Sequence, residues 1–386
     1  MNVPLSPRRR FDTFPRIAYA TGLFIVGSLG TLITPAMFES WTPFHWTPTQ
    51  LGVLAAIELA GLAVGSLSGL YWQRRWKWRQ VALGALLAAV AANVACILRH
   101  DFATVCLARG VVGLSGGFLC AVYSAVLANA KSPGRIIAIT TFIQIGIEGV
   151  FIFSSTSVLD LLGGSGLFVL MTVFFALLLP FVRVLPPGWP ADGTESTHES
   201  GLNGESLRAY PILFSFVPFI VVQTGVYTFL GEFGHEAAHL SSEQTLHAIG
   251  VSVLFSALGS VGAYLLDDRI GFKLPIAGAI LLMIGMLFGM NLGSRSASMF
   301  LFYIALLQIG WIFLNCYLYS ALIEANNLLV PAAMPLSTFG SALGASAMGY
   351  VLEHNGLVGS LGLSVGAMIL TALLTIPFIR PMEQPT

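Results

Sequence analysis

Long apolar runs alternate with short polar segments along the chain from residue 16 to residue 379. A helix that spans a bilayer needs about 20 mainly apolar residues, and twelve runs are long enough. They lie at approximately residues 16–38, 50–72, 80–98, 102–129, 136–159, 164–183, 210–233, 245–266, 274–292, 298–319, 329–350 and 357–379. The pattern therefore predicts an all-α integral membrane protein with twelve transmembrane helices.

The longest polar segment separates the sixth apolar run from the seventh. Residues 186–208 are rich in Pro, Gly, Ser and Glu, a composition typical of a flexible linker. We therefore expect an N-terminal six-helix half over residues 1–185, a linker over residues 186–208, and a C-terminal six-helix half over residues 209–386.

The two halves resemble each other when the sequence is shifted by 194 residues. Ala63–Arg79 (AVGSLSGLYWQRRWKWR) then aligns with Ala257–Lys273 (ALGSVGAYLLDDRIGFK). In the same register, Thr47–Gln50 (TPTQ) falls on Ser241–Gln244 (SSEQ). Two similar hydrophobic halves in one membrane chain are typical of transporters built from structural repeats.

Composition agrees with this interpretation. Charged residues make up 9% of the 386 residues and hydrophobic residues 56%, against about 25% and 45–50% in soluble domains. A chain with so few charged residues cannot cover a water-facing surface. The lipid bilayer is therefore an expected partner. The formal net charge is zero, and nothing indicates nucleic-acid binding.

The basic residues predict the orientation in the membrane. With both termini on one side, only Arg99 and Arg295 face the other side, and Arg109 lies within a helix. Since cytoplasmic loops are rich in Lys and Arg, we expect both termini and the linker in the cytoplasm of a cell, most simply at a bacterial inner membrane. Fifteen of the 18 basic residues fall on that side: Arg8, Arg9, Arg10, Arg16, Arg74, Arg75, Lys77, Arg79, Lys131, Arg135, Arg183, Arg208, Arg269, Lys273 and Arg380.

The six-plus-six repeat, the central linker and the basic turns after the second and eighth helices together resemble the major facilitator superfamily. Its loop signature is roughly Gly-x-x-x-Asp-Arg-x-Gly-Arg-Lys. The second copy in this chain keeps Asp268, Arg269, Gly271 and Lys273. The first copy keeps Arg75 and Arg79 but has Arg74 and Lys77 in place of Asp and Gly.

A second motif, Arg109-Gly-Val-Val-Gly113 in the fourth helix, resembles the Arg-x-x-x-Gly motif of the same family. The resemblance implies a secondary transporter that works by alternating access, with no cofactor, no enzymatic activity and a monomeric state. It implies gating roles for the loop residues Arg75, Arg79, Asp268 and Arg269. It ties Arg109 to proton coupling or to substrate binding.

Three ionisable residues lie within apolar runs, where charge is costly and usually functional. They are Glu58, Arg109 and Glu148. One arginine can neutralise only one carboxylate, so the other would be protonated or would alternate between two states, as in a proton-coupled carrier. Glu148 is the better proton carrier, because Glu58 lies beside a glycine stripe that favours pairing or packing. A purely structural pair with a neutral glutamic acid is the alternative.

Polar side chains on two other helices suggest a substrate cavity. The tenth helix presents Gln308, Trp311 and Asn315 on one face, and the seventh presents Gln223 and Tyr227. In the superfamily, helices 1, 4, 7 and 10 line the cavity. With Arg109 as a fixed cation, this set would suit a small organic solute, anionic or aromatic. Hydrogen bonding between helices is the alternative.

One motif points to different chemistry. His235-Glu236-Ala237-Ala238-His239 matches the H-E-x-x-H zinc pattern. An intramembrane metalloprotease would need a third ligand, and Leu159-Asp160-Leu161 only approaches the expected Leu-Asp-Gly form. His235, Glu236 and His239 are therefore weak metal candidates.

These observations predict a proton-coupled transporter of a small organic solute. A multidrug or metabolite efflux antiporter is the alternative, although Gln144–Gly149 lacks the proline expected in the fifth helix of such antiporters. No phosphate-binding loop indicates ATP-driven transport. The direction of transport stays open.

Overall fold

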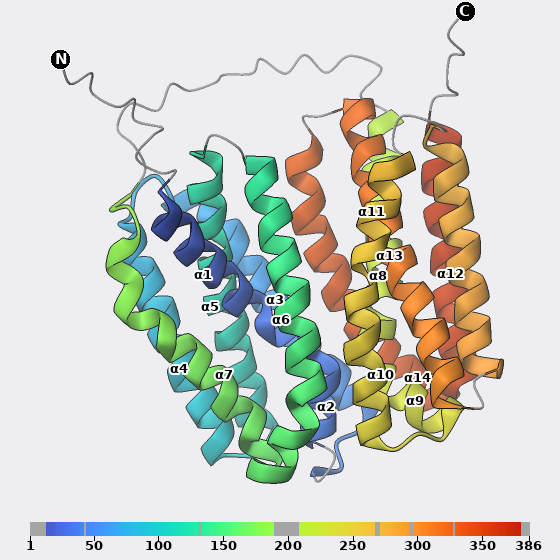
Figure 1. Ribbon diagram of the computed structural model, residues 1–386, viewed down its shortest axis with the longest axis horizontal. Helices are drawn as coiled ribbons and strands as arrows, with labels where there is room; N and C mark the ends of the chain where they lie inside the picture. Colours follow the sequence, from blue (N-terminus) through green and yellow to red (C-terminus); the bar gives the residue numbers. More distant parts are fainter. Residues whose placement is uncertain are drawn as a thin grey trace, which may run out of the picture. The chain divides into compact units, whose positions relative to one another are not determined.

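The computed structural model describes residues 13–41, 44–130, 133–188, 208–266, 271–293, 296–326 and 329–379. These residues form α-helices and short 3₁₀ segments, with no strands among them (Figure 1). The helices of the first part are α1 (Phe14–Leu32), α2 (Thr34–Trp41), α3 (Pro48–Trp72), α4 (Trp78–Leu98), α5 (Phe102–Ala128), α6 (Pro133–Leu162), η3 (Gly163–Ser165), α7 (Gly166–Leu178) and η4 (Leu179–Val184). Those of the second are α8 (Ala209–Thr228), α9 (Leu230–Ala238), α10 (Ser242–Phe255), α11 (Ala257–Leu266), α12 (Lys273–Gly293), α13 (Ala297–Asn326), α14 (Val330–Thr375) and η7 (Ile376–Phe378).

The spans number twelve within the described part of the chain. Nine helical stretches are long and apolar enough to cross a membrane, and the bent pair α1–α2 makes a tenth. Two of the nine, Ile139–Val184 and Ala332–Phe378, contain 46 and 47 residues. At 1.5 Å per residue each extends about 70 Å, more than twice the thickness of the hydrocarbon core, so each supplies two spans. The predicted all-α fold of twelve spans is confirmed.

A glycine separates the two spans of each long stretch. Gly163 and Gly356 have φ of 67° and 60°, in the left-handed region that side chains with a Cβ rarely adopt. The two glycines lie 193 residues apart, so the last two spans of each half are joined by the same kind of turn.

The backbone also repeats at the 194-residue register found in the sequence. His45 and His239 both have a φ of 54°. After each histidine comes a reciprocal capping box: Thr47 and Gln50 bond each other's backbone N–H at 3.3 and 3.0 Å, and Ser241 and Gln244 do so at 3.3 and 3.1 Å. Such boxes satisfy amide groups at a helix start. The alignment of TPTQ with SSEQ therefore reflects a structural repeat.

The chain forms two compact units. Unit 1 comprises residues 1–34, 57–144 and 158–198, and unit 2 comprises residues 35–56, 145–157 and 199–386. Their boundaries pass through α3 and α6 as well as the linker, so the units differ from the two sequence halves. The division into residues 1–185, 186–208 and 209–386 stays a prediction.

Small residues bring helix backbones together inside each unit. In unit 1, a Cβ on Gly61 would lie 2.6 Å from the carbonyl oxygen of Gly110, and Gly65 similarly abuts Leu114. In unit 2, a Cβ on Gly344 would lie 2.5 Å from the carbonyl oxygen of Val221. Close approach of this kind replaces the hydrophobic effect as the source of helix association in lipid.

Two spans that the sequence predicts as continuous are broken near corresponding positions. The first breaks between α1 and α2, where Pro35 lacks the N–H that would bond the carbonyl of Thr31. The hydroxyl of Thr34 donates to that carbonyl instead, at 3.0 Å. The seventh span breaks at Phe229, between α8 and α9. Ile33 and Phe229 have nearly equal φ and ψ, −101° and 16° against −106° and 18°.

Candidate functional site

Arg109 and Glu58 form a buried ion pair in unit 1. The side-chain Nε of Arg109, on α5, donates to Glu58 Oε2 on α3 at 2.9 Å, and its Nη2 bonds Glu58 Oε1. Arg109 is 0% exposed and Glu58 4%. This bidentate geometry is the strongest that an arginine makes with a carboxylate.

The surrounding helices are shaped around this pair. Arg109 Nη1 also donates to Asn93 Oδ1 on α4 at 3.2 Å, and its guanidinium lies 5.9 Å from the ring centre of Phe168 on α7. Gly30 on α1 leaves room for the pair, because a Cβ there would collide with Glu58 Oε1 and Arg109 Nη2. Three of the five N–H donors of Arg109 are engaged in these bonds, and its role as a substrate-binding cation stays a prediction.

Glu148, the third intramembrane group, belongs to unit 2 and has a different partner. Its Oε1 accepts a hydrogen bond from the hydroxyl of Tyr227 on α8 at 2.6 Å. Glu148 is 8% exposed. The ion pairs found among the described residues do not include it. The structure thus brings together two residues that the sequence placed in separate groups, the proton-coupling set and the substrate set.

Several predicted substrate residues have polar atoms that are buried without a hydrogen-bond partner. Among the described residues these include Gln223 Oε1 on α8 and Gln308 Nε2 and Trp311 Nε1 on α13. Gln308 and Trp311 are 7% and 1% exposed. Asn315, also on α13, is half-buried. Since native proteins satisfy most buried polar atoms, these atoms need a partner, either water or a bound solute.

A cavity of about 330 Å³ lies in unit 2 beside the two short helices α2 and α9. Its lining includes Phe38, Glu39, Phe229, Glu232 and His235. The rings of Phe38 and Phe229 meet edge to face, with centres 5.3 Å apart. The volume is within the range of small-molecule pockets.

The H-E-x-x-H segment does not form a zinc motif. His235 Nε2 bonds Glu39 Oε1 at 2.7 Å and its Nδ1 bonds the carbonyl of Leu240 at 2.8 Å. Helix α9 ends at Ala238, and His239 follows in the left-handed conformation. The two histidines therefore do not share a helical face. No group of three or more His, Cys, Asp or Glu side chains arranged for a metal ion is found in the described part of the chain.

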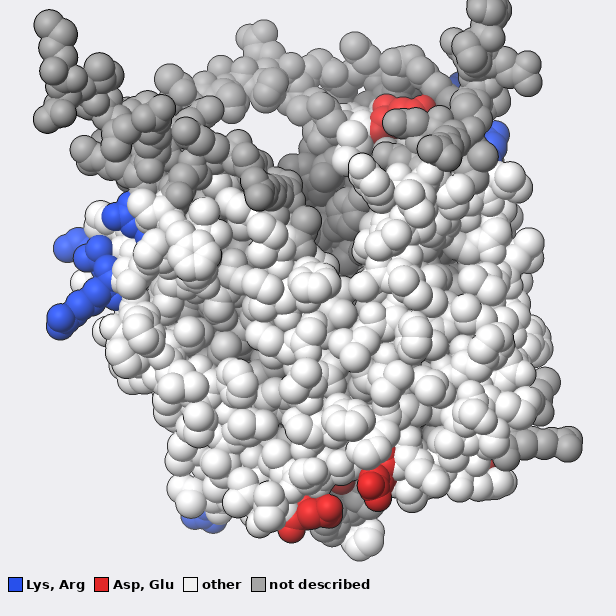
Figure 2. Space-filling model, in the orientation of Figure 1, with Lys and Arg blue, Asp and Glu red and all other residues white. Residues whose placement is uncertain are grey.

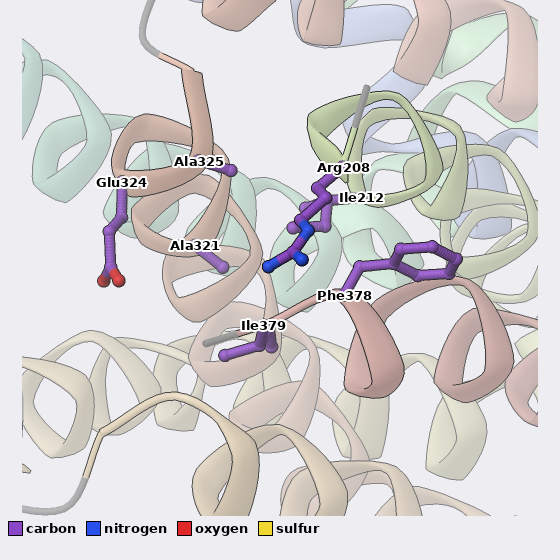
Figure 3. A pocket seen from close by; sticks show the side chains of 7 residues that line it. All are labelled: Arg208, Ile212, Ala321, Glu324, Ala325, Phe378 and Ile379. Carbon is purple, nitrogen blue, oxygen red and sulfur yellow. The ribbon is translucent and has the colours of Figure 1, made fainter. Parts of the chain in front are cut away.

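A second, smaller cavity of about 70 Å³ lies where α8 begins. Figure 3 shows the Arg208 side chain pointing between Ala321 and Ile379, while the carboxylate of Glu324 points away. This volume is far below that of a typical solute pocket.

The predicted gating residues are only partly described. Arg75 lies in the turn between α3 and α4, and Arg79 lies in the first turn of α4, where its Nε donates to the carbonyl of Leu185 at 2.6 Å. Asp268 and Arg269 lie outside the described residues.

Comparison with known families decides the assignment. The sequence profile of the Major Facilitator Superfamily matches residues 19–352. The chain belongs to this superfamily. A superfamily member of this fold is a secondary transporter and a multi-pass membrane protein, not an enzyme, so the metalloprotease alternative is wrong.

Two solved structures share the superfamily fold over nearly the whole chain. One, described as the crystal structure of a D-xylose-proton symporter, has a TM-score of 0.71 and 16% identity, over 95% of this chain and 98% of that one. The other, the xylose transporter XylE from E. coli in an inward open conformation, has a TM-score of 0.68 and 16% identity, over 92% and 94%. At this identity the likeness shows the fold alone. Among curated proteins, none matches this sequence.

Two residues and one contact at these sites have no sequence motif that indicates them. Asn93 is a polar residue inside the third apolar run, and that position alone would have marked it as a candidate. Glu39 lies just past the first run, where a charged residue is unremarkable. The bond from Tyr227 to Glu148 joins helices far apart in the sequence, and helical periodicity does not reveal which faces of two helices meet.

Proposed function

We propose that this transporter couples the movement of a neutral, hydroxyl- or carbonyl-bearing organic solute to protons through Glu148. The observation that carries the proposal is the setting of Glu148: a buried carboxyl in a membrane-spanning helix, bonded to the neutral hydroxyl of Tyr227.

An isolated carboxylate in a low-dielectric interior costs far more free energy than a neutral carboxyl group. Glu148 would therefore hold a proton while it is buried and release it when water reaches the site. A group whose protonation depends on conformation converts a proton gradient into a conformational bias. Arg109 cannot play this part, because a guanidinium does not lose its proton in a protein.

The class of solute follows from the unpaired atoms on α8 and α13. Gln308 Nε2 and Trp311 Nε1 need acceptors, and Gln223 Oε1 needs a donor. A hydroxyl group supplies both, and each bond formed would remove a burial cost of about 1–3 kcal/mol. A solved structure with this fold is described as a D-xylose-proton symporter, which makes polyhydroxy compounds the first solutes to test.

Transport by purified protein in liposomes with an imposed pH gradient tests this proposal. We expect accumulation of a neutral polyol or sugar that stops when a protonophore collapses the gradient. Trp311→Phe, which removes the N–H donor together with part of the indole ring, should weaken solute affinity about tenfold, whereas Tyr303→Phe on the same helix should not. Accumulation that continues after the gradient is lost would refute coupling. Proton-driven extrusion of hydrophobic drugs instead would favour the efflux alternative.

The positive-inside bias supports cytoplasmic termini in a bacterial inner membrane. An impermeant thiol reagent should then label Cys at position 239 but not at position 196 in intact cells. The reverse pattern would contradict this orientation.

A further inference from the structure

The turn between α3 and α4 presents a dense group of cations, which includes the predicted gating residues Arg75 and Arg79. Four exposed basic side chains lie within six residues: Arg74, Arg75, Lys77 and Arg79. The nearest acidic residues along the chain are Glu58 and Asp101. Figure 2 shows Lys and Arg atoms gathered at the left of the molecule, the side on which α4 lies in Figure 1, with no Asp or Glu atoms beside them on this face. We call these four residues, with Tyr71 and Trp76, the α3–α4 patch.

Exposed aromatic rings lie among these cations. Tyr71 and Trp76 are 63% and 55% exposed. The guanidinium of Arg75 lies 4.3 Å above the ring centre of Tyr71, and Trp76 stacks on the buried Trp72. Tyr and Trp concentrate at the interface between hydrocarbon and water, where one end of the side chain is apolar and the other is wet. The patch therefore combines phosphate-binding cations with rings suited to the headgroup region.

The turn that carries the patch is held in place from behind. The indole N–H of the buried Trp78 donates to the carbonyl of Gln73 at 2.8 Å. The amide of Gln73 donates to the carbonyl of Ala121 at 2.8 Å, and Arg79 Nε donates to that of Leu185 at 2.6 Å. A preorganised surface loses less entropy when it binds a partner.

This copy of the loop also departs from the superfamily signature, and both departures make it more positively charged. Arg74 and Lys77 stand where the signature has Asp and Gly, whereas the second copy keeps its acid as Asp268. The change removes the carboxylate that would offset the cations and adds two positive charges. The first loop therefore carries more positive charge than the signature, which favours binding of an external anion.

We propose that the α3–α4 patch binds the phosphate groups of anionic phospholipids and anchors the start of α4 at the membrane surface. Guanidinium groups match phosphate oxygens in a bidentate way. Basic clusters next to a membrane helix attract anionic lipids by about 1 kcal/mol per cation, which corresponds to about fivefold in affinity. This inference does not depend on Glu148 or on the identity of the solute.

The test measures lipid retention by the full-length protein. Purified protein is incorporated into vesicles of phosphatidylcholine alone or with one fifth phosphatidylglycerol, re-extracted, and its bound lipid quantified by mass spectrometry. Wild type should retain phosphatidylglycerol in a salt-sensitive manner. The variant R74Q/R75Q/K77Q should lose about a hundredfold in affinity, and the charge-conserving R74K/R75K should retain most of it.

Matched single substitutions distinguish the patch from charge in general. Lys77→Gln should weaken retention about fivefold, and Arg99→Gln, at the opposite end of α4, less than twofold. Equal losses in these two variants, or wild-type retention by the triple variant, would overturn the proposal. The proposal would also be overturned if phosphatidylglycerol bound only after four acidic residues of the linker were neutralised (Asp192, Glu195, Glu199 and Glu205). That result would mean that the linker, and not lipid, occupies the α3–α4 patch in the wild type. Thermal unfolding of each variant verifies that it is folded.

Discussion

Glu58 and Glu148 are both buried carboxyl groups in membrane-spanning helices, yet their partners differ in charge. Glu58 faces the permanently charged guanidinium of Arg109, which is further tied to Asn93. Glu148 faces the hydroxyl of Tyr227, which carries no charge. Both carboxyls are buried, so under the proposal above the charge of the partner, and not burial, separates the structural carboxyl from the one that exchanges a proton.

The difference has an energetic reason. A buried ion pair keeps both groups charged, because removing either charge leaves the other uncompensated in a medium of low dielectric constant. A carboxyl beside a hydroxyl has no such constraint, since its neutral form loses little on burial. We infer that Glu58 supports the architecture of unit 1 and that Glu148 is free to titrate as water access changes.

The largest expected effect is the loss of one charge from the Glu58–Arg109 pair. Arg109→Met should destabilise the folded protein by about 3–5 kcal/mol, because it leaves Glu58 as an unpaired buried charge. The double variant Arg109→Met/Glu58→Met should recover most of that loss. Unfolding in detergent, followed by tryptophan fluorescence, measures both. If Arg109→Met unfolds like wild type, the pair is not what holds these helices.

Glu148→Gln should instead remove coupling with little change in stability. Gln keeps the size of the side chain and can still accept a hydrogen bond from Tyr227, but it carries no proton to exchange. We expect accumulation against a gradient to fall to background, with solute exchange at equal concentrations within about twofold of wild type. Glu58→Gln is the control. Less of this variant should fold than of wild type, but the protein that does fold should still accumulate solute. Accumulation by Glu148→Gln at the wild-type rate would rule out Glu148 as the proton carrier.

A smaller effect is expected from Tyr227→Phe, which removes the hydrogen bond but leaves the carboxyl. The hydroxyl stabilises the ionised form of Glu148, so its removal should slow the step in which the proton leaves. A net hydrogen bond is worth about 1 kcal/mol, or about fivefold in rate. Coupled uptake should fall by about that factor while exchange persists. Complete loss of both activities would show that Tyr227 contacts the solute rather than only Glu148.

Much of the fold could be predicted from the sequence, because lipid imposes strong rules. Apolar runs of sufficient length predicted the twelve spans, and the 194-residue register predicted a structural repeat, although not the left-handed turns at His45 and His239. The breaks at Ile33 and Phe229 were not anticipated. Pro35 offered a clear signal for the first break, whereas the residues around Phe229 contain no proline.

The candidate site could be predicted only in part. A charge in an apolar run is visible in the sequence, so Glu58, Arg109 and Glu148 could be found there. Which carboxyl meets Arg109 depends on the rotation of each helix, which periodicity does not determine. The H-E-x-x-H match failed for a local reason, since the helix ends at Ala238 and His239 lies beyond it.

Glu39 is a third carboxyl whose partner differs from those of Glu58 and Glu148. Its partner, His235, is a cation that can lose its charge. His235 Nε2 and Nδ1 both face acceptors, Glu39 Oε1 and the Leu240 carbonyl. A neutral imidazole has only one N–H, so this geometry selects the doubly protonated ring. The hydrogen bond to Glu39 is the main cause that raises the pKa of His235 to about 9. The bond joins α2 to α9 and so holds the two short helices of unit 2 together.

The pH dependence of this contact has a definite sign. Because the pKa in the folded state, about 9, exceeds the ordinary value of 6.5, the contact stabilises fully below pH 6.5 and is lost as the pH rises through 9. The bond is partly exposed, so Glu39→Gln should cost only about 1 kcal/mol at neutral pH. That difference from wild type, measured as apparent unfolding temperature, should vanish by about pH 10. His239→Asn, which tolerates the left-handed backbone, should show no such dependence. An equal difference at pH 7 and pH 10 would mean that the imidazolium does not hold α2 to α9.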